Sequence, residues 1–70
     1  MINDRLIADK ILSEVIGSDY NNVQDIGIIM SMIGYDIPNL SISNLICEYL
    51  DIEKRRNRRI ITDLLDKYNY

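Results

Sequence analysis

The stretch Leu45-Ile-Cys-Glu-Tyr-Leu-Asp-Ile-Glu-Lys-Arg-Arg-Asn-Arg-Arg-Ile-Ile-Thr-Asp-Leu-Leu65 carries two apolar patterns with the period of a helix. The first pattern begins just upstream and comprises Ile42, Leu45, Ile46, Tyr49 and Leu50. The second comprises Ile60, Ile61, Leu64, Leu65 and Tyr68. Apolar residues spaced three and four apart form one buried face of a helix. The patterns predict a helix from a cap at Ser41 to about Leu50, and another from a cap at Asp51 to about Tyr68.

Two more helical segments are predicted upstream of this stretch. The first is capped by Asn3 and ends near Ile16, where Gly17 stops it; its apolar stripe is Ile7, Ala8, Ile11, Leu12 and Val15. The second opens with a capping box at Asn21 and Gln24 and runs to about Ile33, before Gly34. Pro38 then pushes Ile37 out of helical geometry. No segment alternates as a strand does, so residues 1–70 are expected to form one all-α domain, a compact bundle of about four short helices.

The second predicted helix is apolar around nearly its whole circumference. Its apolar residues are Val23, Ile26, Ile28, Ile29, Met30, Met32 and Ile33. Such a helix belongs at the centre of a core or against another chain, and four helices of a 70-residue chain can hardly enclose it. We therefore expect a homodimer or partner interface at Ile28, Ile29, Met32 and Ile33. For the methionines, the alternative is that they fill gaps in the core.

Charge is segregated along the chain, although the formal net charge is only −3. Residues 1–53 hold nine acidic and two basic side chains, whereas residues 54–59 hold five basic and no acidic ones. Basic residues near the positively polarised start of a helix are locally unfavourable, and like charges three or four residues apart add repulsion. An anion such as a DNA phosphate would neutralise this cluster. The candidate nucleic-acid-binding residues are Lys54, Arg55, Arg56, Asn57, Arg58 and Arg59.

The quoted stretch resembles the helix-turn-helix of bacterial and phage regulators, especially the winged-helix ones. In that family an aliphatic and a small residue of the first helix pack against the second, and Ile46 and Cys47 fit. Leu50 fits the leucine that closes the first helix, and Ile52 the aliphatic residue that plugs the turn. Apolar pairs then continue down the recognition helix, as at 60–61 and 64–65.

This resemblance implies a small DNA-binding regulator with a C-terminal helix-turn-helix. The helix at 41–50 would brace on the backbone of duplex DNA while the basic recognition helix, residues 52–68, enters the major groove. Asp51 stands where the family often has glycine, and no wing is expected because the sequence ends at Tyr70. Asn57 stands where an aliphatic residue normally packs. It would therefore either read adenine or sit beneath the helix as an imperfect core residue.

A protein-binding module of phage or mobile-element type is the alternative function. It would modify a host or viral regulator through the apolar second helix, with the basic run docking on an acidic protein surface. A simple solvated face and binding to a membrane surface are less favoured, the latter because Asp63 and Asp66 lie on the polar side of the last helix.

Catalysis, metal binding and cofactors are not expected. Histidine is absent, no glycine-rich phosphate loop is present, and the carboxylates are scattered. Cys47 is the only cysteine and is expected to be buried; without an export signal, it indicates a cytoplasmic protein.

Overall fold

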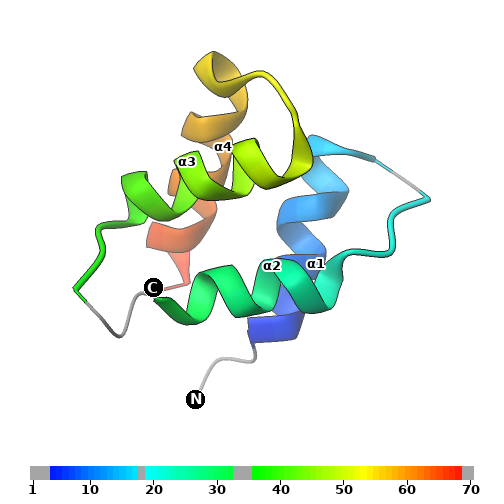
Figure 1. Ribbon diagram of the computed structural model, residues 1–70, viewed down its shortest axis with the longest axis horizontal. Helices are drawn as coiled ribbons and strands as arrows, with labels where there is room; N and C mark the ends of the chain where they lie inside the picture. The colour runs from blue at the N-terminus through cyan, green and yellow to red at the C-terminus, as the bar shows by residue number, and fades with distance from the viewer. Residues whose placement is uncertain (1–3, 18, 33–35, 69–70) are drawn as a thin grey trace.

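The computed structural model describes residues 4–17, 19–32 and 36–68, which form four helices (Figure 1). They are α1 (Asp4–Val15), α2 (Val23–Met30), α3 (Asn39–Leu50) and α4 (Lys54–Lys67). The predicted all-α bundle of four helices is confirmed, and the described ranges contain no strand. None of these helices has the length and apolar character needed to cross a bilayer.

The four helices form two packed pairs that close around one core. α1 packs against α2 and α3 against α4, while α1 also contacts α4 and α2 contacts α3. Figure 1 shows α2 and α3 in front of α1 and α4. Every helix contributes at least two fully buried apolar side chains; the set is Ile7, Ala8, Ile11, Leu12, Ile26, Met30, Ile42, Ile46, Cys47, Ile61 and Leu65. The predicted core face of α1 is confirmed, and that of α4 is confirmed except at Ile60, which does not pack against the core. Met30 is buried in the core, as one of the two alternatives for the methionines predicted.

Two features of the predicted chain path are confirmed at the helix ends. Gly17 stops α1 in the left-handed region, with φ of +102°, and its N–H donates to the carbonyl of Leu12 at 3.2 Å. Glycine has no Cβ and adopts this conformation without strain. Pro38 ends the break before α3 and serves as its N-cap in an extended conformation. The predicted cap at Asn3 lies outside the described residues.

Three predicted helix starts are wrong by one to three residues. α2 is capped by Asn22 rather than Asn21, and no side-chain hydrogen bond closes the predicted capping box. α3 starts at Asn39, so Ser41 already lies inside its first turn. α4 is capped by Glu53, whose carboxylate accepts the Arg56 N–H. Before α2 and α4 more than one side chain with an oxygen lies near the first turn, whereas α3 follows Pro38 with no side-chain cap. At α2 and α4 the packing of the helix against its neighbours selects among these side chains.

The end of α2 also differs from the prediction. The α-helix ends at Met30 rather than near Ile33, and a 3₁₀ turn follows at residues 31–32. Ser31 donates its hydroxyl hydrogen to the carbonyl of Ile28 at 2.6 Å. This short bond belongs to the tighter geometry in which helices commonly finish. The predicted end, Ile33 and Gly34, lies outside the described residues.

The buried face of α3 includes the predicted Ile42, Ile46 and Leu50 but is rotated away from Leu45 and Tyr49. Leu45 and Tyr49 are exposed, whereas Ser43 and Cys47 are fully buried beside Ile46. Small side chains permit close approach of α4, which turns the helix so that positions 43 and 47 face inward. Tyr49 instead donates a hydrogen bond to Asp25 of α2 at 2.5 Å, and so ties α3 to α2 at the surface.

Polar contacts align α3 with α4 along their length. Asn39 donates to Asp66 at 2.7 Å, the hydroxyls of Ser43 and Thr62 lie 2.7 Å apart, and an ion pair joins the far ends. The start of α3 therefore lies beside the end of α4, and the chain reverses direction in the three residues 51–53. Figure 1 shows that the two helix axes cross. As a result, the first turns of α4 lie at one end of the molecule.

Candidate nucleic-acid interface

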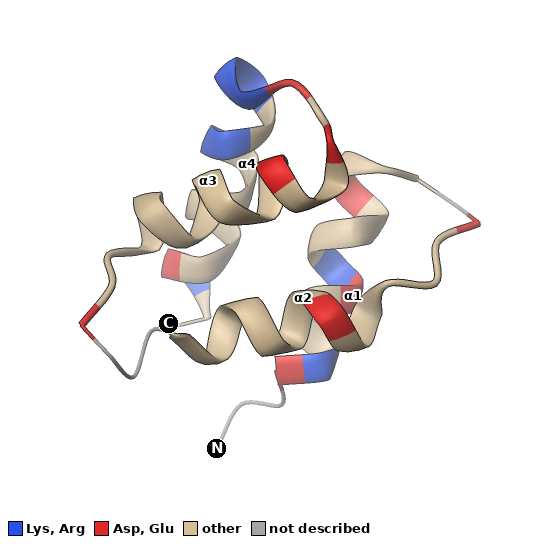
Figure 2. Cartoon of the chain, in the orientation of Figure 1, with Lys and Arg blue, Asp and Glu red and all other residues tan. Residues whose placement is uncertain are grey.

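The basic run, residues 54–59, forms the first turns of α4. All of its side chains are exposed except Asn57, which is half-buried. Figure 2 shows this positive region at one end of the molecule, at the top of the view, while the acidic residues are spread over the other helices, the loops and the later turns of α4. The fold therefore keeps the basic side chains together on one surface instead of distributing them among the carboxylates.

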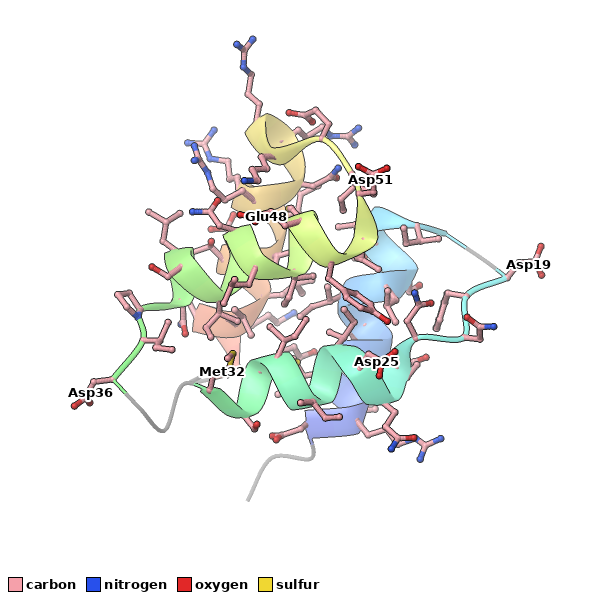
Figure 3. The ribbon with its side chains drawn as sticks, in the orientation of Figure 1. Asp19, Asp25, Met32, Asp36, Glu48 and Asp51 are labelled. Carbon is pink, nitrogen blue, oxygen red and sulfur yellow. The ribbon has the colours of Figure 1, made fainter. Side chains whose placement is uncertain are left out.

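Acidic residues of the turn and of α3 hold the start of α4 in place. The Glu53 carboxylate accepts the Arg56 N–H through both oxygens, at 3.0 and 3.2 Å. A carboxylate at this position interacts favourably with the positive end of the helix dipole. Lys54 pairs with Glu48 at 2.9 Å, in an exposed ion pair that contributes at most about 1 kcal/mol. Figure 3 shows Glu48 on α3 and Asp51 in the turn that follows it.

The four arginines differ from Lys54 in having no internal partner. Within the part of the chain that the structure describes, the side chains of Arg55, Arg56, Arg58 and Arg59 make no ion pair and no hydrogen bond. Their guanidinium groups are exposed although eleven carboxylates are available in the same molecule. Their repulsion is therefore left uncompensated by the fold itself.

Three of these arginines line one open hollow. Arg55, Arg58 and Arg59 surround a space of about 440 Å³ together with Leu40 from the first turn of α3. Thr62 and Asp63 complete the lining, and the Thr62 hydroxyl already contacts Ser43 and the carbonyl of Arg58. The guanidinium groups in this hollow could donate hydrogen bonds to an anion. The Leu40 side chain, which is 51% exposed, could contact an apolar group of the same ligand. The place of Leu40 beside the arginines could not be predicted from the sequence, because it arises only from the crossing of α3 and α4.

The side chain of Asn57 is half-buried and bonds to its own helix. Its side-chain N–H donates to the backbone carbonyl of Glu53 at 2.9 Å. Asn57 is not one of the buried core side chains, and its role in reading adenine stays a prediction. The amide adds a hydrogen bond at the start of α4, and the arginines around it are exposed.

Asp51 occupies the position in the turn where the resembling regulators often have glycine. It adopts the left-handed conformation, with φ of 56° and ψ of 48°. Asp is one of the few residues other than Gly that visit this region at modest cost. Leu50 before it and Ile52 after it pack against the core as partly buried side chains. The substitution of Gly by Asp is thus compatible with the same short turn.

The predicted partner interface on α2 is only partly at the surface. Ile28 is 59% exposed and Met32 is also exposed, whereas Ile29 is half-buried and packs against the core. Ile33 lies outside the described residues. The exposed part of α2 borders a groove against α1, lined by Val23, Gly27 and Ile28 of α2 and by Asp4 and Arg5 of α1.

Other chemistry has little basis among the described residues. No three Cys, Asp or Glu side chains in ranges 4–17, 19–32 and 36–68 are grouped so as to hold a metal ion. Cys47 is buried as predicted, and burial raises the pKa of its thiol, which keeps it in the unreactive neutral form. Comparisons with protein-family models, with curated proteins and with solved structures each found no match.

Proposed function

We propose that this chain binds duplex DNA through the basic run at the start of α4 and acts as a small regulator of the helix-turn-helix type. The observation that carries the proposal is the group of four exposed arginines that have no ion pair or hydrogen bond from their side chains among residues 4–17, 19–32 and 36–68, in an otherwise acidic molecule. DNA phosphates would neutralise these side chains, and guanidinium groups also pair with guanine in the major groove.

The arrangement of α3, the turn and α4 supports this proposal. The three-residue turn, the left-handed Asp51 and the packed Leu50 and Ile52 fit the resemblance on which the prediction rests. Arg55, Arg58 and Arg59 would contact DNA, and Lys54 would contact phosphate. Asn57 would act by holding the first turn of α4. The acidic remainder of the molecule repels DNA, so affinity for random sequence should be modest.

Salt dependence of binding tests the proposal. The affinity for a random duplex is measured by fluorescence anisotropy over a range of salt concentrations. Each phosphate contact should contribute a slope of about −0.9 to the logarithm of affinity against the logarithm of salt. Arg59→Ala should flatten the slope by about one unit if Arg59 contacts phosphate. If it reads a base, it should cost roughly 1–3 kcal/mol on the preferred sequence only.

A matched control separates local contacts from the loss of any positive charge. Lys10 is exposed on α1 and lies outside the basic run, so Lys10→Ala removes the same charge elsewhere. This variant should leave the salt slope unchanged. If the unaltered protein shows no DNA binding even at low salt, the proposal is wrong.

A protein-binding module is the second candidate function, favoured by one observation. Leu40 is exposed inside the hollow that the arginines line, so an acidic peptide with one apolar side chain would complement it. Leu40→Gln should then abolish capture of an acidic partner, whereas the salt slope for DNA, which depends on charge, should stay the same. Capture must persist after nuclease treatment for this second function to hold.

A further inference from the structure

The groove between α1 and α2 is a second surface, far from the basic run. It consists of two adjoining hollows of about 350 and 360 Å³, which share Arg5 of α1 and Val23 of α2 in their linings. One hollow extends along α2 to Gly27 and Ile28, and the other extends along α1 to Leu6 and Asp9. The groove therefore follows both helices and has an apolar side chain at each end.

The two apolar ends of the groove are unusually exposed. Ile28 is 59% exposed and Leu6 is 53% exposed, the largest fractions among the exposed large apolar side chains of the described residues. Neither side chain belongs to the core, so neither is required at the surface for the packing of the monomer. Two such side chains beside one groove form a contact surface that water solvates poorly.

Gly27 leaves the backbone of α2 open in the middle of this surface. A Cβ at this position would meet no atom within 4 Å, and the backbone conformation is helical. Nothing inside the monomer therefore requires glycine, although glycine in a helix interior costs roughly 0.5–1 kcal/mol relative to alanine. An approaching helix would be able to come closest to α2 at this point.

The charges beside the groove favour a copy of the same chain as the occupant. Arg5 and Asp9 lie one turn apart on α1 and both line the hollow that contains Leu6, while Asp4 lines the adjoining hollow. Tyr20 also donates a hydrogen bond to Asp9, which orients the carboxylate. In a two-fold contact each residue meets a different residue of an identical surface, so a patch that carries both signs is self-complementary. The rest of residues 1–53 is predominantly acidic and would repel a second copy.

We propose that a second copy of this chain packs into the α1–α2 groove about a two-fold axis. Leu6 and Ile28 become buried, the other copy approaches α2 at Gly27, and Arg5 of each copy pairs with Asp9 of the other. This inference is independent of nucleic-acid binding, because the groove contains no residue of the basic run.

Sedimentation at micromolar concentration, without DNA, tests the inference. The unaltered chain should be a dimer. Gly27→Gln should weaken it by at least about tenfold and should keep the helical circular dichroism and keep or slightly raise the melting temperature, because the new side chain meets nothing in the monomer. Leu45→Glu is the matched control, since Leu45 is an exposed apolar residue on α3 outside the groove, and it should leave the dimer unchanged. A monomeric unaltered chain, or a dimer that Gly27→Gln does not weaken, overturns the proposal.

Charge exchange tests the two-fold pairing directly. Arg5→Asp places two acidic residues opposite each other in a homodimer, and Asp9→Arg places two arginines there, so each variant alone should be monomeric. An equimolar mixture of the two variants should form a heterodimer, because both pairs are then complementary. If the mixture stays monomeric, or if each variant alone dimerises as the unaltered chain does, the pairing of Arg5 with Asp9 is wrong.

Discussion

Three aspartates carry the sharpest local bends of the described chain. Asp19, Asp36 and Asp51 all have positive φ, at 61°, 61° and 56° (Figure 3). The side chain of Asp is short and polar, which lowers the cost of the left-handed region relative to a branched residue. Asp51 is the C-cap of α3 and begins the turn that leads into α4.

Substitution of Asp51 tests this interpretation through stability. Asp51→Gly should keep or slightly raise the free energy of unfolding, because glycine adopts the same conformation freely. Asp51→Val should lower it by about 1–2 kcal/mol, because a β-branched side chain is strained there. Urea denaturation at neutral pH measures both. Equal stability of the two variants would mean that the left-handed turn is not populated.

Cys47 makes stability depend on alkaline pH. Burial raises the pKa of its thiol, so the folded state holds this proton more tightly than the unfolded chain does. Its contribution to stability is therefore fully present below the ordinary thiol pKa of about 8.5 and is lost as pH rises through the higher folded-state pKa. Denaturation midpoints measured from pH 7 upward should fall, and Cys47→Ala should reduce the first part of that fall. The pKa values of Tyr20 and Tyr49 are also raised, by hydrogen bonds to Asp9 and Asp25, so a later decline should persist in the variant.

Among the elements, the number and type of helices follow directly from the sequence, whereas their ends and faces do not. A stripe such as Ile7, Ile11 and Leu12 is decided within one helix, so its period suffices. The start of α4 depends on which of Asp51 and Glu53 caps it, and that choice depends on where the end of α3 packs. For the same reason the exposure of Tyr49 could not be predicted, since it depends on the position of Asp25 on another helix.

The proposed binding surface lies at the start of α4, where basic side chains are unfavourable for the stability of the helix. Arg55 lies in the first turn, one helical turn before Arg59, where the helix dipole favours an acidic side chain. Arg55→Glu should therefore raise the free energy of unfolding by about 0.5–1 kcal/mol at low salt, and less at high salt. The same change should weaken binding to duplex DNA. If the variant is more stable but binds DNA more weakly, Arg55 lowers the stability of the fold and is retained for binding. If binding is unaffected, Arg55 is not part of the interface.

For the whole molecule, the candidate interface was partly predictable. The run of basic residues is continuous in sequence, so residues 54–59 could be named before the fold was known. The hollow containing Leu40 and the groove containing Leu6 were not, because each is formed by two helices whose crossing the sequence does not specify. Ile28 could be predicted as an interface residue because α2 has more apolar residues than one buried face needs. The sequence of α1 has no such excess, so Leu6 could not be predicted in the same way.

The basic run and the α1–α2 groove lie at opposite ends of the molecule. Figure 2 places the start of α4 at one end and the first turn of α1, which borders the groove, at the other. Two copies joined through the groove would direct their arginines away from each other. Such a particle is bivalent in opposite directions, so it would not occupy neighbouring half-sites of a single duplex and would instead tether two separate DNA segments. Energy transfer between two differently labelled duplexes should therefore rise when the protein is added and fall again in excess, when each duplex acquires its own dimer. The Gly27→Gln variant should still bind either duplex but should not raise the energy transfer between them. If it raises the energy transfer as much as the unaltered protein does, tethering does not depend on dimerisation through the groove.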